Sequence, residues 1–199
     1  MTLYTPQLFE GRDREVARRL IAGHPFATLI TSGGGGGDEP QITHLPLLLR
    51  GDELHGHMAR ANPHWQRFAQ GHTVAVFHGP HAYVSPRWYE TPAIHVPTWN
   101  YATVHVAGRP EAATDDAAAR AMLEALTAHF DPDFRATDER VSRLLGGIAA
   151  FRMPIARLDA KFKMSQNRTA ADRVGVIAAL AQSDLPEDRA TAQWMRTHE

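Results

Sequence analysis

Short runs of β-favouring residues, separated by turns and brief helices, dominate this chain. The runs cover residues 26–31, 42–49, 54–58, 73–78, 101–106 and 149–156, and the last continues toward residue 163. Turn residues such as Gly51 and Asp52 separate neighbouring runs, as they do in β-hairpins. A parallel sheet needs a crossover between its strands, and the sequence has no regular alternation of strand and helix. We therefore predict an α+β fold of mainly antiparallel β, a closed or split barrel with peripheral helices.

Helical spacing and end signals predict the elements around this barrel. Apolar residues keep the helical period over residues 13–22 and 115–130, and a shorter helix is expected over residues 138–145. Asn62, followed by proline, predicts the start of a short helix. Thr169 begins a capping box that predicts a final helix.

Two stretches lack a regular pattern. Residues 79–97 are rich in proline and are predicted to form a long irregular loop. Residues beyond 185 are polar and are predicted to fray. We therefore expect one domain over residues 1–185, the barrel with its helical additions, and a polar C-terminal tail over residues 186–199.

Composition narrows the classes of function. The 21 basic residues are spread among 22 acidic ones, giving a formal charge of −1, so composition gives no support to DNA binding, although it does not exclude it. The absence of cysteine removes thiolate chemistry and is usual for a cytoplasmic protein, the location we expect. No apolar run is long enough to span a membrane, and the first ten residues do not resemble a signal peptide.

Three familiar motifs fit this sequence poorly. The glycine run at residues 33–37 lacks the Gly-Lys-Ser/Thr of a phosphate-binding loop, and we predict a hairpin tip there. His55 and His57 share one face of a strand, but no partner follows at a zinc spacing, so no metal site is predicted. Neither Ser85 nor Ser165 lies in a Gly-x-Ser-x-Gly elbow, and no catalytic residue is assigned.

A ligand with an aromatic ring and a phosphate accounts for more of the remaining polar residues. Arg60 lies between a predicted strand and the predicted helix start at Asn62, where free N–H groups and a guanidinium would attract phosphate. Lys161 and Lys163 add positive charge from one face of a strand. Trp99 and Tyr101 can stack on a ring. His44, Gln166 and Asn167 can meet its polar edge. The alternative is that the aromatic residues belong to a core or interface and the cations are solvated.

Five stretches of the chain resemble one known family. They are residues 43–49 (THLPLLL), 56–65 (GHMARANPHW), 77–86 (FHGPHAYVSP), 96–101 (VPTWNY) and 161–167 (KFKMSQN). In this order they are similar to the PaiB family, bacterial proteins described as FMN-binding negative transcriptional regulators. The resemblance implies an FMN-binding split barrel of the pyridoxamine-phosphate-oxidase-like type, working as a homodimer with the flavin at the interface. The glycine run and the helix that begins at Asp115 depart from the family pattern, outside the shared stretches.

The resemblance also implies which residues bind the cofactor. Residues 43–46 would lie along the isoalloxazine ring, Arg60 and Asn62 would hold the phosphate, and residues 99–101 would reach the ring from the partner subunit. The full expected set is Thr43, His44, Leu45, Pro46, His57, Met58, Arg60, Asn62, Trp99, Asn100, Tyr101, Lys161, Lys163, Gln166 and Asn167.

Three functions follow from these expectations. The family implies a regulator of transcription, although no basic recognition helix is visible in the sequence. The same barrel also serves flavin-dependent oxidoreductases of the flavin reductase, oxidase or haem-degrading type, which need no DNA contact. A flavin-binding module without turnover is the third.

Overall fold

The computed structural model describes residues 3–33, 39–134 and 137–198. The strands are β1 (Phe26–Thr31), β2 (Gln41–Pro46), β3 (Leu48–Arg50), β4 (Glu53–Ala59), β5 (Thr73–Val84), β6 (Thr98–Gly108), β7 (Glu111–Ala112) and β8 (Ile148–Lys163). The α-helices are α1 (Arg14–Gly23), α2 (Asp116–Phe130), α3 (Asp138–Gly147), α4 (Ala170–Ala181) and α5 (Pro186–Thr197), with short 3-10 helices at η1 (Gln7–Phe9), η2 (Pro63–Arg67), η3 (Pro86–Trp88) and η4 (Pro92–Ile94). The hairpin tip predicted for the glycine run lies almost entirely outside the described residues.

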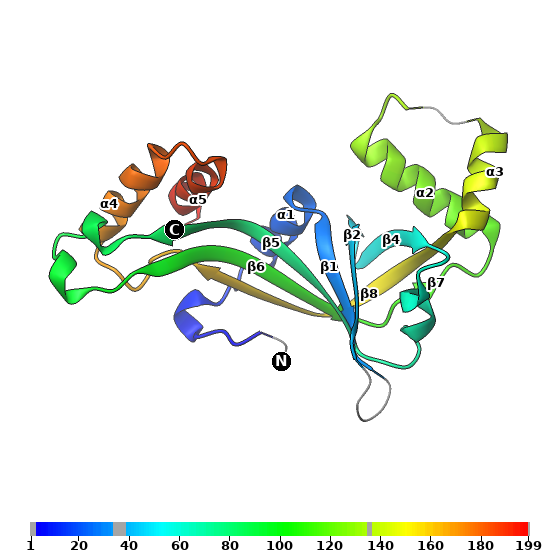
Figure 1. Ribbon diagram of the computed structural model, residues 1–199, viewed down its shortest axis with the longest axis horizontal. Coiled ribbons are helices and arrows are strands. Elements are labelled where there is room, and N and C mark those ends of the chain that lie inside the picture. The colour runs from blue at the N-terminus through cyan, green and yellow to red at the C-terminus, as the bar shows by residue number, and fades with distance from the viewer. Residues whose placement is uncertain (1–2, 34–38, 135–136, 199) are drawn as a thin grey trace.

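The strands form one curled antiparallel sheet. Its order is β2-β1-β5-β6-β8-β4-β3, and β7 pairs with β8. β2 and β3 therefore stand at opposite ends of the sheet, although only Leu47 separates them in the chain. The sheet has to curl until these two ends meet, and it forms the split barrel on the right of Figure 1. The α+β split-barrel fold predicted from the sequence is confirmed.

A glycine makes this closure possible. The side chain of Leu47 is fully buried at the bend between β2 and β3. A Cβ added to Gly56 would lie 2.6 Å from Leu47 Cδ2 and 3.3 Å from the ring of Phe151. Because no side chain fits there, Gly56 lets β4 pass close beneath the bend.

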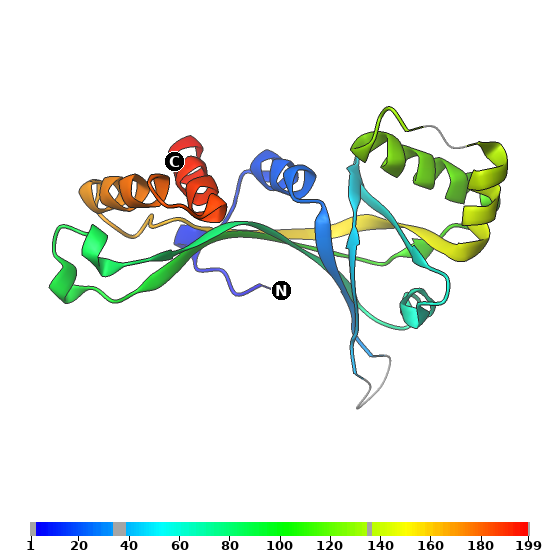
Figure 2. The ribbon, with the colours of Figure 1, turned by 45° about the horizontal axis from the view of Figure 1, so that its top comes forward.

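Beyond the barrel, β5, β6 and β8 continue as a long three-stranded arm. The views in Figures 1 and 2 show α4 and α5 over one face of this arm, and α2 and α3 over β4 and β8 at the opposite end of the molecule. The side chains of Ala192 and Met195 on α5 are fully buried. Among the described residues, no α-helix covers the opposite face of the arm in either view; the N-terminal segment with η1 lies beside β8 on that side.

Two expectations for the arm are wrong. The sequence predicts an irregular loop from residue 79, whereas β5 runs on to Val84. Pro80 is tolerated because β1 pairs with β5 only as far as Val76, and a bulge between His78 and His81 absorbs the irregularity. The sequence also predicts a frayed polar end after residue 185, whereas residues 186–197 form α5.

Smaller differences concern element lengths. The run predicted as one strand over residues 42–49 is divided at Leu47 into β2 and β3. No helix within the described residues has the length and apolar character to cross a membrane.

Candidate functional site

The structure divides the expected cofactor residues into two groups. The first group lies on β2, on β4 and in the turn between β4 and η2, where the barrel closes, and comprises Thr43, His44, Leu45, Pro46, His57, Met58, Arg60 and Asn62. The second lies at the far end of the arm, on β6, β8 and the turn after β8, and comprises Trp99, Asn100, Tyr101, Lys161, Lys163, Gln166 and Asn167.

The two groups are far apart within one protomer. The backbone N–H of Arg60 donates to the carbonyl of Gly147, directly before β8 begins. Lys161 stands fourteen residues further along (161 − 147), near the other end of that strand. At about 3.3 Å per residue this is roughly 45 Å of strand. Figure 2 shows β8 extending along the length of the molecule, so one FMN cannot contact both groups of a single protomer.

β2 provides an open sheet edge in the first group. Among the described strands it pairs only with β1. The N–H of Leu47 donates to Pro25 O (2.9 Å), and hydrogen-bonded positions alternate in an antiparallel pair. The main-chain groups of Ile42 and His44 therefore face the free edge. An unpaired row of N–H and C=O groups can bond the polar edge of a flavin ring.

The two faces of β2 differ. Leu45 is buried in the barrel core. His44 is exposed on the outer face, where its Nδ1 is 3.1 Å from Thr28 Oγ1 and its ring stacks on Phe26 at 6.5 Å. On β4, Met58 is buried, and burial lowers the pKa of His57 below its usual value.

A chain of hydrogen-bonded side chains runs inward from β2. Asn62 Nδ2 donates to Thr43 Oγ1 (3.1 Å), which is 2.7 Å from His64 Nδ1. His64 Nε2 is 2.8 Å from Thr31 Oγ1, which is 2.8 Å from Thr73 Oγ1. His64 is completely buried, and burial lowers its pKa, so the imidazole is neutral at pH 7. We call these five residues the threonine–histidine chain.

Sequence reasoning misses the inner members of the threonine–histidine chain. His64 lies within a family stretch, but nothing in its neighbours distinguishes it from an exposed histidine. The signal that could have found His64 is a pair of polar residues in apolar strands. Thr31 ends one such strand, Thr73 begins another, and the two residues pair directly in the sheet. That pairing depends on the register between β1 and β5, which the sequence does not give.

Arg60 is exposed at the end of β4. Its Nε donates to Gly146 O (3.0 Å), while no partner of its two terminal nitrogens is found in the part of the chain that the structure describes. The expected helix N-terminus beside it does not contribute, because η2 is a five-residue 3-10 helix. The N–H of His64 in that helix already donates to Asn62 Oδ1 (3.0 Å). A phosphate here would therefore meet the guanidinium of Arg60 rather than helix N–H groups.

The second group has an exposed part on the open face of the arm. Trp99 is 52% exposed. A cavity of about 360 Å³ beside it is lined by His78, Gly79, His81, Trp99, Tyr101, Ala102, Thr103 and His105. This is a concave, aromatic and histidine-rich surface of the kind that accepts a ring.

Two lysines border this face. Lys161 Nζ donates to the carbonyl of Tyr4 (2.9 Å) and lies 5.4 Å from the rings of Tyr4 and Tyr101. Lys163 Nζ donates to Thr98 Oγ1 and to Trp99 O. Desolvation, and then the neighbouring charge of Lys161, lower the pKa of Lys163. Neither lysine has a carboxylate partner among the described residues, but Lys161 is only 9% exposed, so Lys163 is the more accessible cation for an anion on this face.

Other members of the second group form hydrogen bonds within the protein. Asn100 is fully buried; its Nδ2 donates to Ser165 Oγ (3.0 Å) and contacts Met195 Sδ beneath α5. Gln166 accepts from the N–H of Met164 (2.6 Å) and donates to the carbonyl of Phe162. These bonds hold the end of the arm, and the flavin contacts expected of Asn100 and Gln166 stay predictions. Asn167 is exposed.

The arrangement fits a flavin mononucleotide. The free edge of β2 suits the polar edge of the ring, and the terminal nitrogens of Arg60 suit a phosphate. Trp99 and Tyr101 offer aromatic surface on the open face of the arm. Together, the curled antiparallel sheet and these residues define a flavin-binding split-barrel protein.

Comparison with known proteins gives the family. The model of the family described as "Putative FMN-binding domain" matches residues 3–157. The chain is also 32% identical, over 97% of its length and 96% of the relative's, to "Protease synthase and sporulation protein PAI 2" of Bacillus subtilis. It belongs to this FMN-binding family, the PaiB family that the sequence stretches indicate, and its cofactor is FMN.

Solved structures share the fold. The FAD and haem binding protein from Mycobacterium smegmatis matches with a TM-score of 0.65 at 20% identity, covering 83% of this chain and 78% of that one. The flavocytochrome Anf3 from Azotobacter vinelandii matches with a TM-score of 0.64 at 15% identity, covering 77% and 69%. At these identities the similarity establishes the barrel fold alone.

Proposed function

We propose that this protein is a homodimer in which each FMN lies between the barrel of one protomer and the arm of the other. The observation that carries the proposal is the separation of roughly 45 Å along β8 between Arg60 and Lys161. A twofold symmetric pair brings the same two surfaces together twice, so both sites are completed at once. The exposed Trp99 and the open edge of β2 would then be covered.

Any regulatory role is proposed to act through the bound flavin rather than by reading DNA. α4 and α5 form a helical hairpin with a short turn, the arrangement in which a second helix would enter the major groove. The first turn of α5 contains Glu187 and Asp188. Acidic side chains at the end of the helix that reads bases would be repelled by DNA phosphates. A regulatory signal is better supported if the redox state or the occupancy of the flavin changes the shape of the dimer, and that shape is what a partner recognises.

A mixing experiment tests the shared site. Arg60→Ala removes the phosphate contact from the barrel, and Trp99→Ala removes the ring contact from the arm. Each variant alone should bind FMN at least tenfold more weakly, about 1.4 kcal/mol, in a flavin fluorescence titration. Mixed and reassorted, the two variants form heterodimers with one intact site, so about a quarter of the sites should regain full affinity.

The controls separate the possible failures. Arg67→Ala, which removes a half-buried arginine of η2 that bonds Gln70, should leave FMN affinity unchanged. No recovery on mixing would mean that Arg60 and Trp99 do not serve one site across two protomers. A monomer by light scattering, or a protein that takes up no FMN, would overturn the proposal itself.

A flavin-dependent oxidoreductase is the second candidate, and the histidine-lined cavity beside Trp99 favours it. His78 and His81 border that cavity and are exposed, so they are available as proton donors or substrate contacts. Anaerobic bleaching of the bound flavin by NADH or NADPH would support this function. A flavin that neither nucleotide reduces would leave the regulator as the better candidate.

A further inference from the structure

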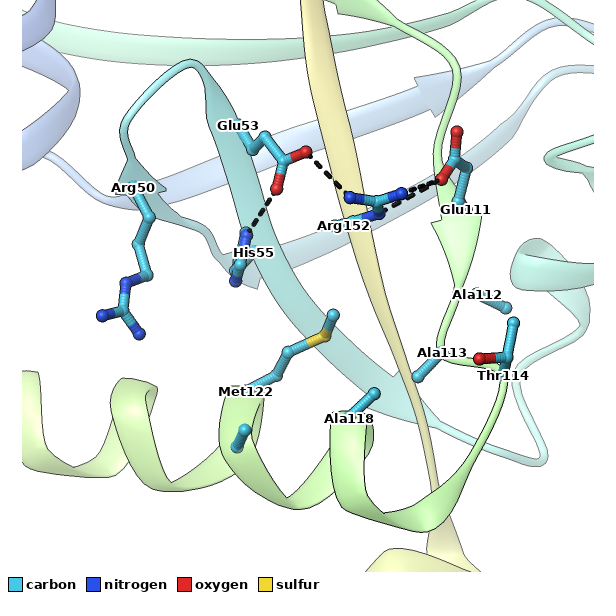
Figure 3. A pocket seen from close by; sticks show the side chains of 11 residues that line it. Arg50, Glu53, His55, Glu111, Ala112, Ala113, Thr114, Ala118, Met122 and Arg152 are labelled. Atoms are coloured by element: carbon cyan, nitrogen blue, oxygen red, sulfur yellow. Dashed lines mark hydrogen bonds and ion pairs between the residues drawn. The ribbon is translucent and has the colours of Figure 1, made fainter.

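A second and larger cavity lies between the sheet and α2. Its volume is about 650 Å³, within the usual range for small-molecule sites. It is lined by Arg50, Glu53, His55, Glu111, Ala112, Ala113, Thr114, Ala118, Ala121, Met122 and Arg152, as Figure 3 shows. None of these residues belongs to the cofactor set expected from the sequence.

The sheet side of the cavity is a connected polar network. Arg152 Nη1 is 3.1 Å from Glu53 Oε1, and its Nη2 is 2.8 Å from Glu111 Oε2. The other carboxylate oxygen of Glu53 is 3.0 Å from His55 Nε2. Arg152 thus holds both carboxylates, and the three charged groups are engaged with one another (Figure 3).

Arg50 stands outside this network. It extends from the end of β3 toward α2 in Figure 3. No hydrogen bond, ion pair or ring contact to its guanidinium is found within the described residues. The charges of Arg50, Glu53, Glu111 and Arg152 sum to zero, and Arg50 is the one cation among these four groups that has no carboxylate partner. An incoming acidic group therefore has a free partner here.

The opposite wall is apolar. Ala118 and Met122 of α2 face the polar network in Figure 3, one helical turn apart. A methionine side chain adapts to the shape of what packs against it. The cavity therefore offers an acid-binding end at Arg50 and an apolar surface on α2.

The cavity is close to the expected flavin. His55 lines it, and His57, of the first cofactor group, projects from the same face of β4 two residues further along. Two residues of strand span roughly 7 Å. A molecule in the cavity would thus lie beside His57, a residue expected to contact the flavin.

We propose that this cavity binds a small organic anion beside the flavin, with the acidic group paired to Arg50 and the apolar part against α2. The ligand's place beside the flavin rests on the proposed function; the binding site itself does not. The same ligand would be the substrate of an oxidoreductase or the effector of a flavin-dependent regulator.

Benzoate and benzamide test the charge requirement, because they share a shape and differ in the carboxylate. Calorimetric titration of the full-length protein without FMN should show benzoate binding, with affinity at least tenfold weaker for benzamide. Arg50→Gln should weaken benzoate to the level of benzamide. Arg19→Gln, which makes the same charge change on an exposed face of α1, should leave benzoate affinity unchanged. Ala118→Leu, which keeps a good helix former while filling the cavity, should also weaken binding.

The outcomes are distinguishable from failure of the flavin proposal. Absence of benzoate binding, or equal affinity in the Arg50→Gln variant, would overturn the site. Benzoate should further perturb the absorption bands of bound FMN in the loaded protein, with the same dependence on Arg50. Binding without a spectral change would refute the position beside the flavin. Failure to load FMN at all would overturn the proposed function and leave the calorimetric result standing.

Discussion

Thr31→Val tests whether the threonine–histidine chain stabilises the barrel. Valine has the shape of threonine but cannot form its hydrogen bonds. The change leaves two buried atoms without this partner, His64 Nε2 and Thr73 Oγ1, in residues that are 0% and 1% exposed. Each buried polar atom left without a partner costs about 1–3 kcal/mol, so we expect a loss of about 2–4 kcal/mol. This is a large part of the free energy of unfolding of an ordinary domain.

Urea unfolding followed by circular dichroism measures this loss. Protomer concentration has to be held fixed, because association shifts the apparent stability. Thr31→Ser keeps the hydroxyl and removes one methyl group, so it should cost only about 1 kcal/mol. Adding Thr73→Val to Thr31→Val should recover part of the loss, because one of the two unpaired atoms is then gone.

Two results would refute this reasoning. A Thr31→Val protein within about 0.5 kcal/mol of the parent would mean that the buried atoms find other partners or water. A double variant less stable than Thr31→Val would mean that packing, rather than hydrogen bonding, dominates at this point. A change in the urea dependence itself would instead indicate an altered unfolded state.

Two further predictions concern pH and closure of the barrel. Burial lowers the pKa values of His57 and His64, so below about pH 6.5 the unfolded chain takes up protons that the folded protein does not. The free energy of unfolding should therefore be highest above that pH and fall as the pH drops. Urea midpoints measured from pH 7.5 to 5.5 should show this fall, and the fall should be smaller in His64→Gln. A slope that is unchanged in the variant would contradict this assignment. Gly56→Ala should lower the thermal midpoint through a loss of about 1–3 kcal/mol, because its Cβ would lie 2.6 Å from Leu47 Cδ2. Gly146→Ala, with no atom within 4 Å of its Cβ, is the control, and an equal loss at both positions would count against the close approach.

The local sequence pattern predicts most of the helices and strands but not which other elements they pack against. Alternation and end signals correctly indicate β1, β4 and the cap at Asn62, because those signals lie within a few residues. The extension of β5 through Pro80 depends on where β1 stops pairing, which is a matter of tertiary register. α5 is held by burial of Ala192 and Met195, so a composition that looks polar overall hides its apolar stripe.

The same holds for the candidate site: its segments can be predicted from the local sequence, but their tertiary contacts cannot. The family stretches identify the segments around β2 and the arm, yet the burial of Asn100 beneath α5 is visible only once α5 is placed. The cavity at Arg50 has no counterpart in any motif. It arises because α2 packs across β4 and β8, elements far apart in the chain. Neither the free guanidinium nor the cluster around Arg152 can be inferred from the spacing of their residues.

The pairing of β4 with β8 has a consequence for biosynthesis. Ala59 pairs with Ile148, 89 residues later (148 − 59). On the ribosome, about 5–20 residues are added each second, so β4 waits roughly 4–18 s for its neighbour. During that interval its only available partner is β3, a strand of three residues. The nascent chain therefore carries an open sheet edge for seconds, and its yield in the cell will depend on how well that edge is shielded before β8 emerges.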